Sequence, residues 1–211
     1  MAVRNWAAVA AVIVLGFAAA FAATAQTLAA GPAYTAKGEL QFPADYRRWA
    51  YLSSGLDMSY RAGPAMPGMS QFDNVFVNPA AYDAFLQTGT WPDGTVMVLE
   101  TRRGEQNGSI NKAGRFQTER LGVEVHLKDT VRFKDSAGFA GGWAFVSFDG
   151  EGPGQLIPTT ATCYACHEAH AAVDRTFVQF YPTLKPIAAA KGTFSAAYLA
   201  EEAAAKAPPA P

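Results

Sequence analysis

The two cysteines of this chain stand in one pentapeptide, Cys163-Tyr164-Ala165-Cys166-His167. The spacing Cys-x-x-Cys-His is the attachment signature of c-type haem. In such a site each thiol forms a thioether to the macrocycle, and the neighbouring imidazole binds the iron from one side. We therefore predict one covalent haem c, held by Cys163, Cys166 and His167, with His167 as the axial ligand of the metal.

Three other chemistries use the same residue types. A Cys-x-x-Cys pair can be a dithiol redox site, but that site belongs to a βαβ unit, and no alternating strand-helix pattern precedes the pair. The two thiols with His167 and His170 could bind zinc, although four ligands would crowd onto barely two helical turns. A disulfide across two residues would be strained and would close a very small loop. Haem attachment is the interpretation we adopt.

An apolar segment opens the chain. Residues 1–25 have the pattern of a secretory signal peptide, with Arg4 ahead of an apolar run over residues 6–23 and the small-x-small sequence Ala23-Thr24-Ala25 at its end. An uncleaved membrane anchor is the alternative, because the run is close to spanning length. Bacteria attach c-type haem outside the cytoplasmic membrane. The segment and the haem motif together therefore predict a periplasmic protein.

Composition indicates a single domain with no nucleic-acid partner. The formal net charge of -1 provides no electrostatic attraction to nucleic acid, and 12% aromatic residues suit a core around a large flat cofactor. The chain after residue 25 fits one domain, and no internal repeat is visible. We expect an N-terminal leader over residues 26–36, a haem domain over 37–190 and an Ala/Pro-rich tail over 191–211.

The region before the motif reads mainly as strands. The expected strands cover residues 73–77, 95–101, 121–127 and 142–148. A short helix is expected over 46–53 and a Pro/Gly loop over 63–68. A second helix follows Pro79, with Asn78 as its cap, and ends at Gly89.

The region from the motif onward reads as helical. One helix is expected to begin near Thr160 and to continue through Phe177 and Phe180 until Pro182 and Pro186 break it. A terminal helix is expected over 194–206, capped by Thr193 or Ser195, with disorder after it. The predicted fold is therefore mainly β (α+β), an antiparallel sheet with a C-terminal helical segment that carries the haem.

The remaining histidines, His126 and His170, are expected to be surface residues. His126 alternates with Glu124 on one face of its strand, so we expect both to face solvent, with distal iron ligation by His126 as the alternative. His170 lies three residues after His167 on a neighbouring helical face. It is expected to be a surface residue.

The sixth iron position depends on whether any methionine binds it. No methionine follows Cys163, and those that precede it usually fill gaps in a core. The methionines that could still reach the iron are Met58, Met66, Met69 and Met97. The arginines that could pair with haem propionates, or simply lie in solvent, are Arg47, Arg48, Arg102 and Arg103.

Several short motifs resemble the cytochrome P-460 family in order and spacing over roughly residues 37–185. They are Phe76-Val77-Asn78-Pro79, Asp93-Gly94-Thr95-Val96, Trp143-Ala144-Phe145 and the haem pentapeptide. The resemblance implies a mostly β, homodimeric, periplasmic protein with one haem and five-coordinate iron. Some members oxidise hydroxylamine or bind nitric oxide.

The resemblance also bears on the distal face of the haem. Members with the unusual P-460 spectrum carry a lysine bonded to the haem edge, and Leu99 matches that position here. The chain is therefore more similar to the uncrosslinked cytochromes c′-beta, which bind small gases at an apolar face, with Phe76 and Leu99 as distal candidates. Binding of nitric oxide or another small nitrogen oxide, hydroxylamine oxidation and plain electron transfer remain as three functions. The sequence does not identify a redox partner.

Overall fold

The structure, a computed structural model, describes residues 31–59 and 68–207. The predicted signal segment, Met66, nearly all of the 63–68 loop and residues 208–211 lie outside these ranges. Among the described helices, none combines the length and apolar character that crossing a membrane requires.

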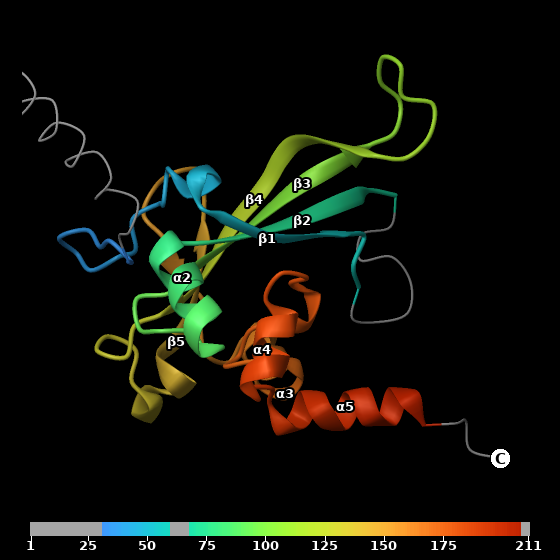
Figure 1. Cartoon of the computed structure of the whole chain (residues 1–211). Helices are drawn as coiled ribbons and strands as arrows, with labels where there is room; N and C mark the ends of the chain where they lie inside the picture. Colours follow the sequence, from blue (N-terminus) through green and yellow to red (C-terminus); the bar gives the residue numbers. More distant parts are fainter. Residues whose placement is uncertain (1–30, 60–67, 208–211) are drawn as a thin grey trace, which may run out of the picture.

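Six antiparallel strands form one sheet in which each strand pairs with its neighbours in sequence (Figure 1). This order confirms the prediction of a mainly β, α+β fold with its helices concentrated after the strands. The strands are β1 (Ala50–Leu56), β2 (Ser70–Val77), β3 (Val96–Glu105), β4 (Phe116–Lys128), β5 (Trp143–Phe148) and β6 (Gln155–Leu156).

Both faces of the sheet are covered. One face packs against the helices in a cluster that includes Met97, Phe85 and Tyr198. The other packs against the N-terminal segment in a cluster that includes Val98, Val125 and Tyr46. Because residues alternate between the faces of a strand, neighbours such as Met97 and Val98 are both buried. The sheet is thus the middle layer of the molecule.

The expected helix over residues 46–53 is wrong in its second half. Only Tyr46–Arg48 form a 3₁₀ turn, η2, and β1 follows at once. β1 pairs with β2 from Ala50 opposite Val77 to Leu56 opposite Phe72. Pairing with a neighbouring strand therefore determines the secondary structure of a segment whose local sequence pattern is ambiguous.

Helix α2 (Pro79–Thr88) begins and ends as predicted, with Gly89 left-handed at φ +74°. The predicted cap is corrected in its detail. The Asn78 side chain makes no hydrogen bond to the helix. Its Nδ2 donates to the Gly94 carbonyl at 3.2 Å and its Oδ1 accepts from Val96 N–H at 2.8 Å. Asn78 therefore ties the start of α2 to the start of β3.

The helix predicted from Thr160 to Pro182 is wrong beyond its first half. α3 spans Thr162–His170, a tight hairpin turn follows, and the next helical pieces are η5 (Val178–Phe180) and α4 (Lys185–Lys191). Pro186 lies in the first turn of α4, where its missing N–H costs nothing. It begins a helix rather than breaking one.

The terminal helix α5 (Ala196–Lys206) is confirmed, and Ser195 is its cap, since the Ser195 Oγ accepts from Tyr198 N–H at 3.1 Å. The same hydroxyl donates to the Ala171 carbonyl at 2.7 Å. Tyr198 is buried in the core. The region expected to be a tail from residue 191 is therefore packed against α3 as far as α5 extends (Figure 1).

Candidate haem site

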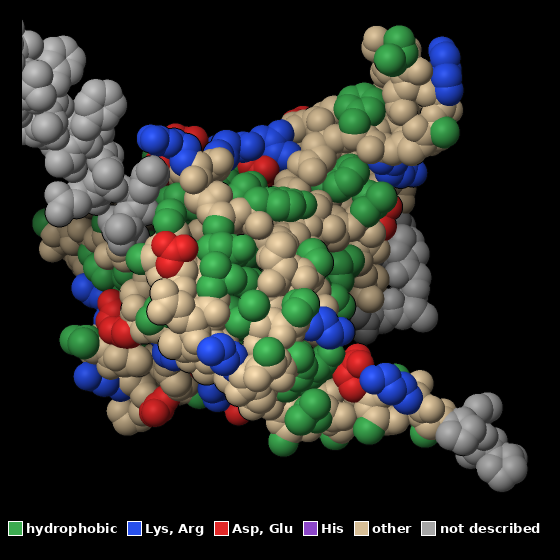
Figure 2. All heavy atoms as spheres, in the orientation of Figure 1, with side chains coloured by type: hydrophobic (Ala, Val, Ile, Leu, Met, Phe, Trp, Pro, Cys, Tyr) green, Lys and Arg blue, Asp and Glu red, His purple; other side chains and the backbone are tan. Residues whose placement is uncertain are grey.

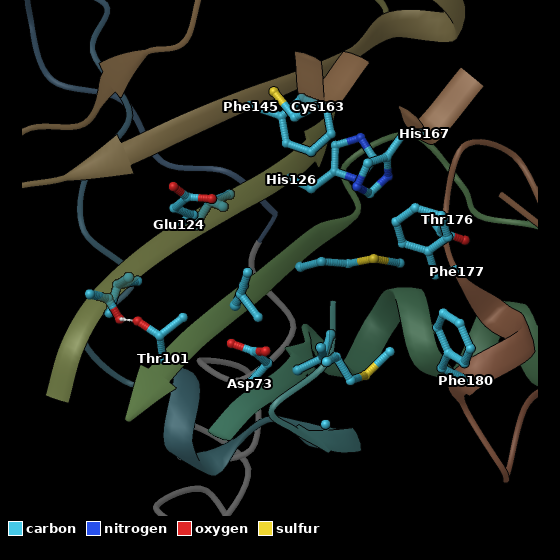
Figure 3. Close-up of a pocket in the computed structure, with 18 of the residues that line it drawn as sticks. Asp73, Thr101, Glu124, His126, Phe145, Cys163, His167, Thr176, Phe177 and Phe180 are labelled. Carbon is cyan, nitrogen blue, oxygen red and sulfur yellow. Dashed lines mark hydrogen bonds between the residues drawn. The ribbon is translucent and has the colours of Figure 1, made fainter. Parts of the chain in front are cut away.

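A cavity of about 800 Å³ opens between the helix-covered face of the sheet and the C-terminal segment. Strands β1 to β5 form one side, and α3 with residues 176–181 forms the other (Figure 3). This volume lies in the range of cofactor and ligand pockets. Cys163, Cys166 and His167 all line the cavity.

The two cysteines lie about one helical turn apart on α3, so they share a face of the helix. Both are free thiols and half-buried, and burial raises the pKa of the Cys163 thiol. The disulfide interpretation is therefore not realised. Within residues 31–59 and 68–207, no three His, Cys, Asp or Glu side chains are grouped as a metal site. His170 instead pairs with Glu201 of α5, which removes it from the zinc interpretation.

His167 has the hydrogen bond that an iron ligand needs. Its Nδ1–H donates to the Arg175 carbonyl across 2.7 Å, and this tautomer leaves the lone pair on Nε2. Burial lowers the pKa of the imidazole, although the Arg175 carbonyl opposes the shift. A neutral imidazole whose second nitrogen donates to a carbonyl is the usual state of a metal-binding histidine. The thiols, the imidazole and the cavity thus fit a c-type haem.

Three aromatic rings contact the His167 ring. The centroids of Phe177, Phe145 and His126 lie 4.3, 4.7 and 4.8 Å from it, and His126 stacks on Phe145 at 4.0 Å with only 4° between the planes. Figure 3 shows this group at the end of the cavity that also holds Cys163. The rings restrict the orientation of the imidazole.

The expectation that His126 faces solvent is wrong, because β4 is buried from Val125 to Leu127 and only 8% of His126 is exposed. Its Nε2 is fully buried, with no hydrogen-bond partner among the described residues. Burial and the proximity of His167 and Arg175 lower the pKa of His126. The rings of His126 and His167 are in contact, so no iron could lie between them. His126 lines the cavity beside His167, and in this arrangement it would not be placed to bind an iron opposite His167.

The two residues predicted for the distal face, Leu99 and Phe76, lie on opposite faces of the sheet. Leu99 lines the cavity, but Phe76 does not. Phe76 lies on the opposite face of the sheet and packs on Tyr46 and Tyr51, with centroids 5.5 and 5.6 Å away. Val75, which pairs with Leu99 across β2 and β3, is the cavity residue instead. The assignment of Phe76 is corrected because the sequence did not give the facing of β2.

Two methionines reach the cavity. Met58 and Met97 line it, and Met69 does not. Met58 packs closely on β1, since a Cβ built on Gly55 would lie 2.3 Å from its sulfur. A side chain at position 55 would therefore displace Met58.

Two carboxyl groups also line the cavity, and sequence reasoning gave neither a place there. Glu124 is exposed, as its strand pattern predicted, yet partial desolvation raises the pKa of its carboxyl. Burial also raises the pKa of Asp73, although Gln71 Nε2 donates to its carboxylate at 2.6 Å. The alternation along each strand shows which residues share a face with Asp73 or Glu124, but only the strand register tells which face lines the cavity.

The four candidate arginines do not line the cavity. Arg47 and Arg102 pair with Glu100, which is buried behind the sheet and also accepts from the Tyr46 hydroxyl. Burial opposes ionisation of Glu100, but hydrogen bonds from Arg102 and Tyr46 outweigh it and lower the pKa of the carboxyl. Arg103 pairs with Glu119. The propionate assignment is corrected, since the three paired arginines serve other carboxylates and Arg48 lies outside the lining.

Comparison with known proteins gives one family. The sequence model of the family described as Cytochrome P460 matches residues 43–178, from η2 through the haem motif. This chain belongs to the Cytochrome P460 family. Membership implies haem c, and the spacing of Cys163 and Cys166 is consistent with its attachment. No curated protein matches the chain.

Proposed function

We propose that this Cytochrome P460 protein is an exported cytochrome with one covalent haem c, which binds nitric oxide or another small nitrogen oxide opposite His167. The observation that carries the proposal is the cavity itself. It brings both thiols and a neutral, hydrogen-bonded imidazole to one wall and the apolar side chains of Val75, Met97 and Leu99 to another.

In this proposal each residue has a stated task. Cys163 and Cys166 tether the macrocycle, and His167 binds the iron through Nε2. When bound, haem supplies an iron that coordinates small neutral ligands. Leu99 cannot form the bond that the lysine of crosslinked members makes, so the macrocycle keeps an ordinary c-type structure. The apolar wall excludes water and favours neutral ligands.

Two other functions have a supporting observation each. Hydroxylamine oxidation releases protons, and the carboxyl groups of Asp73 and Glu124 lie in the cavity to accept them. Electron transfer with six-coordinate iron is supported by Met58, whose sulfur is close to the cavity wall at Gly55. The missing lysine argues against the first, and the close packing of Met58 on β1 argues against the second.

We also propose a periplasmic homodimer. The apolar segment over residues 6–23 and its small-x-small end support export. Tyr51 and Leu56 of β1 are 54% and 47% exposed, and exposed apolar side chains of this size support an interface. Acidic and basic side chains are interspersed on the face shown in Figure 2. N-terminal sequencing that begins at Gln26 would support cleavage, and sedimentation at twice the monomer mass would support the dimer.

Optical spectra of the purified protein test the iron site. We expect high-spin spectra for the ferric and ferrous forms and a new ferrous spectrum on addition of NO. A low-spin ferrous spectrum that becomes high-spin in Met58→Leu would favour the electron carrier. Turnover of hydroxylamine with an artificial electron acceptor would favour the oxidase. A polypeptide mass without added haem would overturn all three functions.

The variant Leu99→Lys provides an internal comparison. If Leu99 occupies the family's crosslinking position, a lysine there is expected to bond to the haem edge and to change the ferrous absorption spectrum, while Leu99→Met leaves it unchanged. Identical spectra for the lysine and methionine variants would contradict this placement of Leu99 relative to the haem edge.

A further inference from the structure

A two-residue hairpin turn follows the haem helix. Val173 and Thr176 pair across it through backbone hydrogen bonds of 2.8 and 3.3 Å, and its central residues Asp174 and Arg175 have φ of +43° and +61°. Positive φ at both central positions is the type I′ pattern, for which Asn-Gly is the favoured pair. Neither residue here is glycine. A left-handed backbone is unfavourable for arginine, so surrounding contacts must hold the turn.

Two strands supply these contacts. The Asp174 Oδ2 accepts from Lys128 Nζ at 2.6 Å, and its Oδ1 accepts from Trp143 Nε1 at 3.1 Å. Lys128 also donates to the Trp91 carbonyl at 3.0 Å, and the Trp91 indole N–H donates to the Thr176 hydroxyl at 2.8 Å. Lys128 ends β4, Trp143 begins β5, and the two are paired in the sheet. The position of the turn is therefore set by the sheet.

The strained turn presents one backbone group to the haem site. The Arg175 carbonyl accepts the Nδ1–H of His167 at 2.7 Å. The Arg175 side chain points to a different partner, Glu168, at 2.5 Å. Backbone strain that neighbouring contacts maintain is a recurrent sign of a functional position. Here the position is the hydrogen-bond acceptor of the axial ligand.

We propose that Lys128 and Asp174 are positioning residues, which hold the 173–176 turn so that the Arg175 carbonyl fixes the tautomer of His167 and strengthens it as an iron ligand. The inference rests on the proposed function, because it requires His167 to bind iron. Neither Lys128 nor Asp174 lines the cavity. Both therefore act through Arg175 and not by contact with haem or its ligand.

The reduction potential should change in opposite directions for loss of this hydrogen bond and for loss of the Lys128 charge alone. A strong hydrogen bond from Nδ1–H makes the imidazole a better donor, which favours ferric iron and strengthens the iron–imidazole bond. Loss of the bond should raise the reduction potential. Removing the positive charge of Lys128 without moving the turn should instead lower the potential, because a nearby cation favours the ferrous state.

The experiment compares purified, haem-loaded wild type with Lys128→Met, Asp174→Asn and Arg175→Gly. Reduction potential and the iron–imidazole stretching frequency of the ferrous, ligand-free protein are the two readouts. We expect Lys128→Met to raise the potential and to lower the frequency, and Asp174→Asn to lower the frequency as well. Arg175→Gly keeps the carbonyl and suits a positive φ, so the frequency should stay at the wild-type value, while loss of the guanidinium charge should lower the potential. Lys134→Met, at an exposed lysine, is the charge-matched control.

Each outcome has one meaning. A lowered potential with an unchanged frequency in Lys128→Met would overturn the inference, as would wild-type values for both readouts. If Lys128→Met does not fold, the frequency of Asp174→Asn decides, since a distant charge does not alter that bond directly. Absence of covalent haem in the wild type would overturn the proposed function, and that result is seen by mass before either readout is taken.

Discussion

His126→Phe is expected to stabilise the protein. The Nε2 of His126 is buried without a partner among the described residues, and an unsatisfied buried polar atom costs about 1–3 kcal/mol. A phenylalanine keeps the parallel stack on Phe145, and its ring is only slightly larger than the imidazole. At pH 8, where the imidazole is neutral in both states, the free energy of unfolding should rise by about 1–2 kcal/mol.

The gain should grow as pH falls. Burial, His167 and Arg175 hold the pKa of His126 well below 6.5 in the folded protein. Between that pH and the lower folded pKa, the unfolded chain binds a proton that the folded protein does not, so wild type loses stability on acidification. The advantage of the variant should therefore be larger at pH 5 than at pH 8.

Urea unfolding of haem-loaded protein at pH 8 and pH 5, followed by circular dichroism, measures both effects. His170→Phe is the matched control. His170 is exposed and pairs with Glu201, so its replacement should change the free energy of unfolding by less than about 1 kcal/mol. A destabilised His126→Phe, or a gain that does not depend on pH, would show that His126 has a partner in the haem-loaded protein. The reasoning from an unpaired nitrogen would then be wrong.

Three other substitutions test the surroundings of the site. Glu100→Ala leaves two arginines and the Tyr46 hydroxyl without their shared acceptor, and should cost about 3–5 kcal/mol in urea unfolding with haem content unchanged. Glu124→Gln removes a carboxyl whose pKa burial raises. Because the side chain is exposed, the effect should be small: a rise in Tm of less than about 2 °C at pH 7 and none at pH 4. Gly142→Ala places a Cβ 2.7 Å from Thr130 Cγ2 at φ +75°, and should lower the free energy of unfolding by about 1–3 kcal/mol. An unchanged urea midpoint would contradict the geometry at this glycine.

Local sequence rules predicted the elements whose signals are local. α2 has proline at its start and glycine at its end, and the central strands have unbroken apolar or alternating runs. The haem motif also required no long-range information, because Cys163 and His167 are brought together within one helix. For these parts of the fold and site the sequence was sufficient.

Other features depend on contacts between distant segments. The turn that follows α3 is made by the left-handed pair Asp174 and Arg175, and that pair is held by Lys128, far away in the sequence. No propensity rule predicts two such residues in succession. The short β6 is another example, since it exists only through its pairing with β5.

The main error at the site was the prediction of which strand face lies inside the molecule. Alternation identified the two sets of residues on β4 correctly, but we assumed that one set met water. The N-terminal segment covers the outer face and buries Val123, Val125 and Leu127. On the inner face Glu124 is exposed, as expected, but His126 lies inside the molecule. For the same reason Phe76 was predicted on the cavity side of β2, where the structure has Val75.

If the cavity admits small ligands to a bound haem, its lining would select them by charge as well as by size. Among its described lining residues, the carboxyl-bearing side chains are Asp73 and Glu124, and none is Lys or Arg. An entering nitrite or azide would meet like charge and no compensating cation. Uncharged guests such as NO would encounter no such barrier. Discrimination between a gas and its oxidised anion would then need no gate, only the absence of a basic residue along the walls.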